Sequence, residues 1–318
     1  KEVQDELAES GTQKILQNAF SDKDALQLLS IDKEDYKKEL FSLYKDNIVD
    51  QYYGLKIQYL YPFISEEDFT YIPSPYLVVN AVTESMLNRL TFNDNNLRRA
   101  IGKEVIENYL YDMVKQLNTV TWISSELSYQ KGRDKLLTSD VIAAEGDNIV
   151  FYDTKAIAPG LKLRKFDTAE IEKDIEIYAK DVIQIYNQIN NYLQGLFQLD
   201  KLYSKNNIFG IVVVLEDAVV SRKKVYEKVY EILENTETLT EENRRYICSH
   251  IKILPLRAIE CMVLQNTSLL PELTSQLEKP ERWYDYTYTN TTTENGVIPL
   301  YGQYEKDIKN RIAVCINS

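Results

Sequence analysis

Residues 139–155 read SDVIAAEGDNIVFYDTK, and this stretch decides the fold that the sequence predicts. Two apolar runs flank a short polar turn, which is the pattern of a β-hairpin. Asp140 opens the first predicted strand, and Asp153 and Lys155 end the second. Side chains two residues apart on a strand point to the same face, so Asp153 and Lys155 should project together while Thr154 faces the other way. The hairpin therefore predicts two carboxylates and one amine close together, a set that suits a divalent cation.

The composition bounds the class of protein. The chain has 318 residues and a hydrophobic content of 44%, enough for a large core domain with further parts. Its first ten residues are charged rather than signal-like and no apolar run could cross a bilayer, so the sequence predicts a cytoplasmic protein with no membrane partner. A single histidine, His250, excludes histidine-rich zinc sites, and any serine or cysteine triad would have to use it.

Charge is unevenly distributed along the chain. The formal net charge of −12 argues against a nucleic-acid partner, because polyanions need local positive potential. Between residues 129 and 166, however, seven lysines and arginines outnumber five acids. Lys131 and Arg133 precede the hairpin, and Lys162 and Arg164 follow it. These four cations are candidate phosphate-binding residues, with plain solvated loops as the alternative.

Apolar spacing divides the chain into three predicted parts. Residues 1–75 are acidic and carry apolar residues at helical spacing, which predicts an N-terminal helical region of two or three amphipathic helices. Residues 76–265 alternate strand-like and helix-like segments, the signature of an α/β core. Residues 266–318 are predicted to form a C-terminal extension packed on that core. The acidic helices would be either a solvated face or a surface that docks a partner or covers the active cleft.

Within the core, a predicted helix over residues 97–117 buries a stripe that includes Val105, with Glu107 on its shoulder. A basic loop, YQKGRDK, precedes the hairpin. Glutamines 184 and 188 lie on a polar stripe of the long helix that follows it, and they face either the site or solvent. The other predicted elements are strands at 120–127, 207–215 and 251–256 and helices at 78–90, 167–199, 221–234, 240–249 and 257–264.

Glu107 on a helix, Asp140 opening a strand, and Asp153, Thr154 and Lys155 ending the next strand resemble the active-site pattern of the PD-(D/E)xK nuclease superfamily. Asp-x-Lys alone occurs often by chance, whereas this tripeptide at a hairpin end behind an upstream helical glutamate is much rarer.

The resemblance covers about residues 97 to 265, roughly half of the chain. Two departures are visible: Ser139 stands where the pattern has a proline, and Asp153 is the aspartate alternative at the acidic position. Neither departure removes a ligand. The resemblance implies a restriction-endonuclease-like α/β fold, with a mixed central sheet flanked by helices, in addition to the N-terminal helical region.

The resemblance also implies a catalytic site. Mg²⁺ or Mn²⁺, hard ions that prefer oxygen, would be held by Glu107, Asp140, Asp153 and the carbonyl of Thr154. Lys155 would either help to deprotonate the attacking water or stabilise charge in the transition state. Gln184 and Gln188 occupy the place where family members often carry a glutamine that faces the site, and they could hold the substrate phosphate or the water.

The implied function is a Mg²⁺-dependent deoxyribonuclease, an endonuclease of restriction or anti-phage defence, with RNA not excluded as a substrate. It could act as a homodimer or with a partner subunit such as an ATPase or a sensor. Two alternatives stay open. One is a catalytically inactive nuclease-like module that binds nucleic acid or serves as a scaffold in a larger complex. The other is an unrelated α/β interaction protein, which the acidic N-terminal region would favour.

Overall fold

The computed structural model describes residues 27, 29–44, 57–58, 61–73, 77, 95–156, 168–215, 220–236, 239–265, 267–275 and 277. The chain divides into two compact units. The first comprises Lys1–Leu90 with Gly160–Asp167, and the second comprises Thr91–Pro159 with Thr168–Ser318. Among the described residues, no helix is both long and apolar enough to span a membrane. The predicted helix at 78–90 and most of the predicted C-terminal extension, from residue 278 onward, lie outside the described residues.

The first unit contains a small sheet that the helical prediction missed. Strand β2 (Phe63–Glu66) pairs in parallel with β1 (Ser30–Asp32) and antiparallel with β3 (Phe69–Tyr71), and α3 (Lys33–Tyr44) follows β1. The predicted N-terminal helical region is therefore helical only in part. These strands are three or four residues long, too short for a clear period-two pattern, and β1 finds its partner more than thirty residues along the chain.

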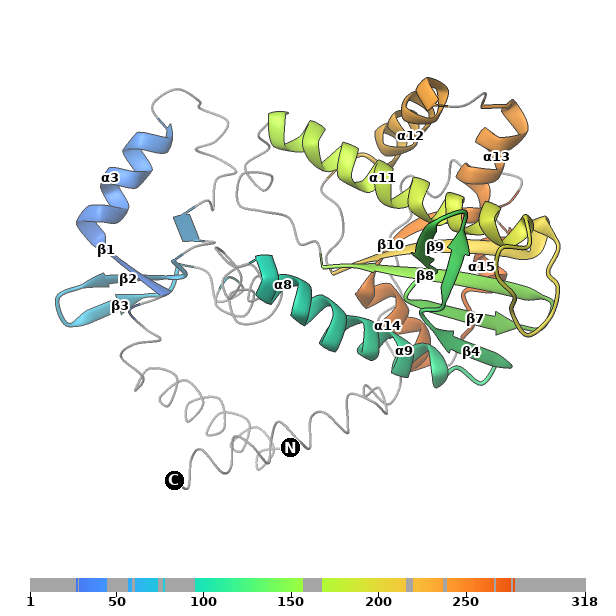
Figure 1. The fold of residues 1–318 in the computed structure, drawn as a ribbon. Coiled ribbons are helices and arrows are strands. Elements are labelled where there is room, and N and C mark those ends of the chain that lie inside the picture. The colour runs from blue at the N-terminus through green and yellow to red at the C-terminus, as the bar shows by residue number, and fades with distance from the viewer. Residues whose placement is uncertain are drawn as a thin grey trace, which may run out of the picture. The chain divides into compact units, whose positions relative to one another are not determined.

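A five-stranded sheet forms the centre of the second unit, in the order β10-β9-β8-β7-β4 (Figure 1). Strands β4, β7 and β8 are antiparallel neighbours, whereas β8, β9 and β10 run parallel. This arrangement confirms the predicted mixed sheet and the predicted hairpin, which is β7 and β8. The strands are β4 (Trp122–Ser125), β7 (Val141–Glu145), β8 (Asn148–Lys155), β9 (Ile208–Val214) and β10 (Ile251–Pro255).

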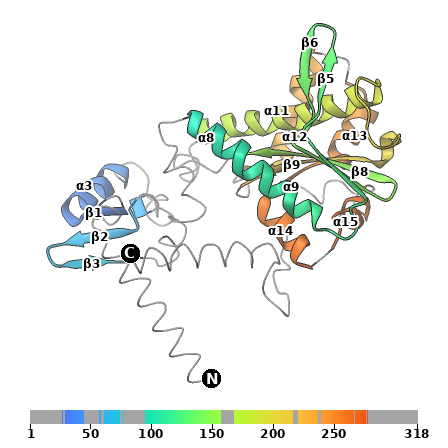
Figure 2. The same cartoon turned by 60° about the horizontal axis from the view of Figure 1, so that its bottom comes forward.

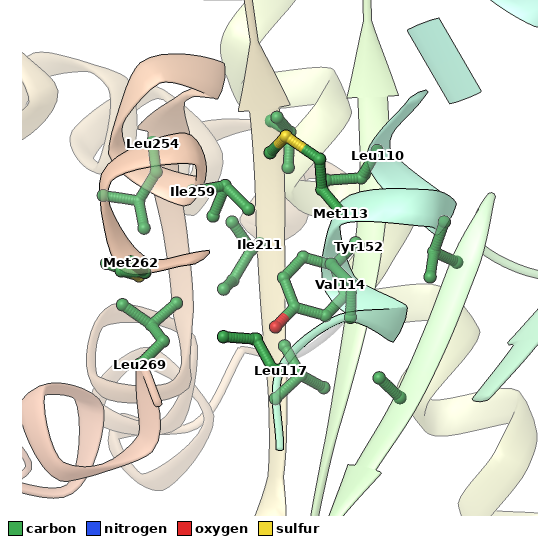
Figure 3. Packing of buried hydrophobic residues seen from close by; sticks show 14 of the residues in the cluster. Leu110, Met113, Val114, Leu117, Tyr152, Ile211, Leu254, Ile259, Met262 and Leu269 are labelled. Carbon is green, nitrogen blue, oxygen red and sulfur yellow. The ribbon is translucent and has the colours of Figure 1, made fainter. Parts of the chain in front are cut away.

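Helices flank the sheet, as predicted. Helices α9 and α14 pack on one face, and α11 covers the other with α12 beside it (Figure 1). A cluster of buried apolar side chains, including Leu110, Met113 and Tyr152, fills the space between the sheet, α9 and α14 (Figure 3). The helices that follow the hairpin are α11 (Thr168–Leu193), α12 (Arg222–Thr236), α13 (Glu241–His250), α14 (Leu256–Gln265) and α15 (Leu270–Ser275).

The predicted helix over residues 97–117 is present, but its middle is a π-helix. It consists of α8 (Asn95–Ile101), the π-helical segment η1 (Gly102–Glu107) and α9 (Asn108–Lys115). Val105, predicted on the buried stripe, is 57% exposed, while its neighbour Ile106 is buried. A π-helix holds more residues per turn than an α-helix, so a stripe drawn at 3.6 residues per turn fails inside it.

The segment predicted as a basic loop is a second hairpin. Strands β5 (Ser128–Lys131) and β6 (Asp134–Leu137) pair antiparallel and form a separate two-stranded sheet. Figure 2 shows this ribbon projecting from the second unit beside α11. Gly132 begins its two-residue turn with φ +64°, a conformation that glycine adopts without steric cost. The density of charged residues concealed the strand pattern.

Candidate active site

The topology gathers acidic residues at one edge of the central sheet. This is the edge formed by the ends of the strands, and not the side of an outer strand. Because β4 and β8 both run antiparallel to β7, the ends of β4 and β8 lie at the same edge as the start of β7. The last paired row at that edge aligns Ser125, Val141 and Tyr152. Glu126, Asp140 and Asp153 each come one position beyond this row. Three carboxylates from three neighbouring strands are thus brought to one place by strand direction alone.

Asp153 and Lys155 project from β8 toward α11, as the alternation of the strand predicts. The ammonium Nζ of Lys155 lies 2.7 Å from Asp153 Oδ2 and donates a hydrogen bond of 3.1 Å to Gln184 Oε1. Gln184 Nε2 in turn donates to Asp153 Oδ1 at 3.4 Å. The Asp153 side chain is only 3% exposed and that of Lys155 is 21% exposed. The structure therefore brings together these three sequence-predicted residues in one network with partial access to solvent.

Asp181 on α11 belongs to the same network and was missed from the sequence. Its Oδ1 lies 3.6 Å from Lys155 Nζ. Burial raises the pKa of Asp181 to about 6, although the neighbouring ammonium acts to lower it. Asp181 precedes Gln184 by three residues, so it lies on the same helical face. That three-residue spacing from Gln184 was the available signal in the sequence.

Burial also governs the Asp153–Lys155 pair. It raises the pKa of Asp153, against the opposing effect of the Lys155 ammonium. The pKa of Lys155 is likewise raised: burial is its largest single influence and lowers it, but Asp153 and Asp181 together outweigh that influence. Lys155 is therefore an ammonium in this arrangement, held by three acceptors on two elements.

Asp140 is fixed from across the hairpin by Thr154. Its Oδ2 accepts hydrogen bonds of 2.6 Å from both the backbone N–H and the side-chain hydroxyl of Thr154. Thr154 was predicted to contribute its carbonyl to a metal. The structure gives its N–H and hydroxyl a different task, which is to hold the Asp140 carboxylate at the sheet edge.

Glu107 reaches the same edge from the π-helical segment. Burial, followed by the negative charges of Asp140, Glu126 and Asp153, raises the pKa of Glu107 to about 7, against the opposing effect of Lys103. Burial and Asp140 also raise the pKa of Glu126, a residue that the sequence reasoning missed. Its signal was its place at the end of the predicted strand, since antiparallel pairing puts that end beside Asp140. The charge of Asp140 therefore contributes to the raised pKa values of Glu107, Glu126 and Asp153.

The structure places Gln188 in a structural contact and not in its predicted role in substrate binding. It is 4% exposed, and its Oε1 accepts a short hydrogen bond from the hydroxyl of Ser139, the residue before Asp140. A side chain buried in this way supports the entry to β7 and does not present an amide to a substrate.

The predicted phosphate-binding cations fall in different places. Lys131 donates a hydrogen bond of 2.9 Å to Asn191 Oδ1 on α11, and Arg133 is exposed in the turn of the β5–β6 hairpin. Lys162 and Arg164 lie outside the described residues.

The donor chemistry of the site fits a hard divalent cation, because carboxylate oxygens are what Mg²⁺ and Mn²⁺ prefer. The mutual repulsion that raises the Glu107 pKa is also relieved by a cation. Within the described part of the chain, no group of three or more histidine, cysteine or acidic side chains is arranged to hold a metal ion as it stands. Asp153 faces Lys155, so a cation would compete with that contact, whereas Thr154 engages only Oδ2 of Asp140.

A comparison of the chain with models of known protein families, with curated proteins and with solved structures found no match in any of the three.

Proposed function

We propose that this chain is a nuclease with a restriction-endonuclease-like core that hydrolyses the phosphodiester bonds of DNA with the help of Mg²⁺ or Mn²⁺. The observation that carries the proposal is the network at the end of β8, where the Lys155 ammonium contacts Asp153 and Gln184. Asp140 lies at the same edge, and Glu107 is electrostatically coupled to both acids. The residues that resemble the nuclease pattern in type and order therefore also lie close together in space, which supports the proposal.

Glu107, Asp140 and Asp153 would hold the cation. When bound, a divalent cation neutralises charge on the phosphoryl oxygens and lowers the pKa of a bound water. Asp140 is already oriented by Thr154, so it would enter such a site with little loss of side-chain freedom.

Lys155 would supply positive charge toward the phosphate. Its pKa is raised by Asp153 and Asp181 despite burial, which favours the charge-stabilising role over that of a general base. The amide of Gln184 contacts both Lys155 and Asp153, because its oxygen accepts from Lys155 and its nitrogen donates to Asp153. From that position its amide would orient the attacking water or a phosphate oxygen.

The biological setting that we propose is an endonuclease of restriction or anti-phage defence in the cytoplasm. It would act as a homodimer or with a partner subunit such as an ATPase or a sensor. The competing candidate is a catalytically inactive nuclease-like scaffold. An inactive module has no need to retain carboxylates whose burial and mutual repulsion raise their pKa values, as at Glu107 and Asp153.

Cleavage assays test the proposal. Plasmid, linear and single-stranded DNA and RNA would be incubated with Mg²⁺, with Mn²⁺ or with EDTA, using the wild type, Asp153→Ala and Lys155→Ala. We expect metal-dependent cleavage of DNA by the wild type and a loss of at least about a hundredfold in each variant. The matched control is Lys173→Ala, an exposed lysine of α11 that pairs only with Glu170 among the described ion pairs. Equal cleavage by wild type and site variants, or no metal-dependent cleavage at all, would refute it.

A further inference from the structure

The β5–β6 hairpin joins two of the site acids through the chain. Glu126 lies two residues before β5, and Asp140 lies three residues after β6. Three residues of chain span at most about 11 Å, so the end of the ribbon cannot be far from Asp140. The base of the ribbon is closed by Thr138, whose Oγ1 accepts from the Leu127 N–H at 2.8 Å and whose own N–H donates to the Leu127 carbonyl at 2.9 Å.

One face of the ribbon is anchored to α11. Tyr129 is buried, its hydroxyl accepts a hydrogen bond of 2.8 Å from Asn191 Nδ2, and its ring lies 4.8 Å from that of Phe197. Lys131, two residues along and so on the same face, donates to the same asparagine. The hairpin is therefore a fixed projection of the second unit.

The opposite face of the ribbon is exposed and has a distinct chemistry. The cross-strand register places Gln130 beside Lys135 and Ser128 beside Leu137 on this outward face. All four residues are exposed, and Leu137, an apolar residue, is 47% exposed. Arg133 adds a further exposed cation in the turn. The face thus offers an amide, an ammonium, a hydroxyl and an apolar side chain, all of which reach solvent.

We propose that this outward face enters the major groove of duplex DNA beside the cleaved phosphodiester. The inference rests on the proposed nuclease function and specifies its substrate as a B-form duplex. Two strands lie about 4.8 Å apart, and the major groove of B-DNA, about 12 Å wide, admits such a ribbon with its side chains. Three cations against one acid in ten residues give the ribbon a positive charge that complements DNA in an otherwise acidic chain.

The same features count against two other nucleic acids. The major groove of an A-form RNA duplex is deep and too narrow for side chains to read. Single strands are bound by stacking bases on exposed aromatic rings, but the only aromatic side chain of the ribbon, Tyr129, is buried against Phe197. Amide, ammonium and apolar groups are instead the types that read base edges in a major groove: glutamine pairs with adenine, lysine with guanine, and an apolar side chain contacts the thymine methyl.

Binding measurements test this inference separately from cleavage. Fluorescence anisotropy would give the affinity of the full chain for a short DNA duplex, for its single strand and for an RNA duplex of the same sequence, over a series of salt concentrations. We expect the DNA duplex to bind at least about tenfold more tightly than the other two. The double variant Arg133→Ala with Lys135→Ala should weaken duplex binding about tenfold and reduce the salt dependence.

Two further variants sharpen the result. Lys224→Ala with Arg245→Ala removes the same two residue types from exposed positions on α12 and α13, and it should leave duplex binding unchanged. Gln130→Ala should relax sequence preference with little change in salt dependence, because it touches base edges and not phosphates. Melting temperatures equal to that of the wild type would show that these exposed changes leave the fold intact.

The possible outcomes separate the two proposals. Equal binding of single strands or of RNA, or equal losses in the hairpin and control variants, would overturn the inference. An unchanged sequence preference in the Gln130→Ala variant would also overturn the inference, because the ribbon would then contact the sugar-phosphate backbone of the DNA and not its base edges. Duplex binding through the hairpin without any cleavage would support this inference and refute the nuclease function. If the wild type and the hairpin variants cleaved duplex DNA equally well, the nuclease function would be supported and this inference refuted.

Discussion

Lys155 Nζ lies 2.7 Å from Asp153 Oδ2, and both side chains are largely withdrawn from solvent. A buried charge that loses its partner is strongly destabilising, because its desolvation is no longer compensated. We therefore expect Lys155→Met to lower the free energy of unfolding by about 3 kcal/mol at pH 8, measured by urea denaturation. Adding Asp153→Asn to this variant should restore much of the loss, because only Asp181, whose Oδ1 lies 3.6 Å from Lys155 Nζ in the wild type, is then left without its cation. If the double variant were as unstable as Lys155→Met, the pair would not be the source of the effect.

Glu107 should make stability depend on pH. Its pKa is raised in the fold from the ordinary 4.5 to about 7, so between these values the folded chain binds more protons than the unfolded chain. Its contribution to stability is present below pH 4.5 and is lost as the pH rises through about 7. Glu107→Gln should accordingly raise the melting temperature at pH 8 by about 2–4 °C and leave it nearly unchanged at pH 4.

Glu104→Gln is the control for this effect, because Glu104 is an exposed residue of the same π-helical segment. Its melting temperature should follow that of the wild type at both pH values. A Glu107→Gln variant that was less stable than the wild type at pH 8 would contradict the raised pKa.

Gly210 on β9 permits the close approach of α11. A Cβ added there would lie 2.3 Å from Ile185 Cγ2, which is well inside van der Waals contact. We expect Gly210→Ala to destabilise the fold by about 1–3 kcal/mol through overpacking. In the background of Ile185→Ala, the same substitution should have almost no further effect. Thermal unfolding of the two single variants and the double variant measures this coupling.

Gly102 offers the matched comparison. A Cβ there would meet the Ala156 Cβ at 3.5 Å, an ordinary contact, so Gly102→Ala should be neutral or slightly stabilising. Equal losses at the two glycines would argue against the specific clash with Ile185.

The buried pair of Gln188 and Ser139 should be structural. Gln188→Ala leaves the Ser139 hydroxyl without its amide partner, and the cost of such a group is about 1–3 kcal/mol. The measurable result is a lower melting temperature in a variant whose affinity for DNA is unchanged once the protein is folded. A loss of DNA affinity without a loss of stability would return Gln188 to its predicted role in substrate binding.

The sequence was sufficient to predict the site residues whose positions follow from the local strand pattern and the direction of the strands. The alternation around Asp153 and Lys155 placed both on one face, and the tight turn after β7 fixed the hairpin register, so their proximity to Asp140 followed. Asp181 and Glu126 were missed because their importance comes from burial and from neighbours on other elements, which no single segment displays.

The β5–β6 ribbon and the small sheet of the first unit were missed for another reason. Their strands are only three or four residues long, and most residues of β3, β5 and β6 are exposed, so they lack the apolar alternation by which strands are recognised. What stabilises the ribbon is tertiary, namely the contacts of Tyr129 and Lys131 with Asn191 on a helix some sixty residues away.

The π-helical segment that ends at Glu107 has a consequence for how the site tolerates deletion. In an α-helix each residue advances the direction of its side chain by about 100° and its height by about 1.5 Å. Removing one residue between Gly102 and Ile106 would let the segment return to α-helical winding while α9 kept its packing on the sheet. Such a one-residue deletion should be far better tolerated here than in α9, because the wider turn already contains a residue that an α-helix would not need.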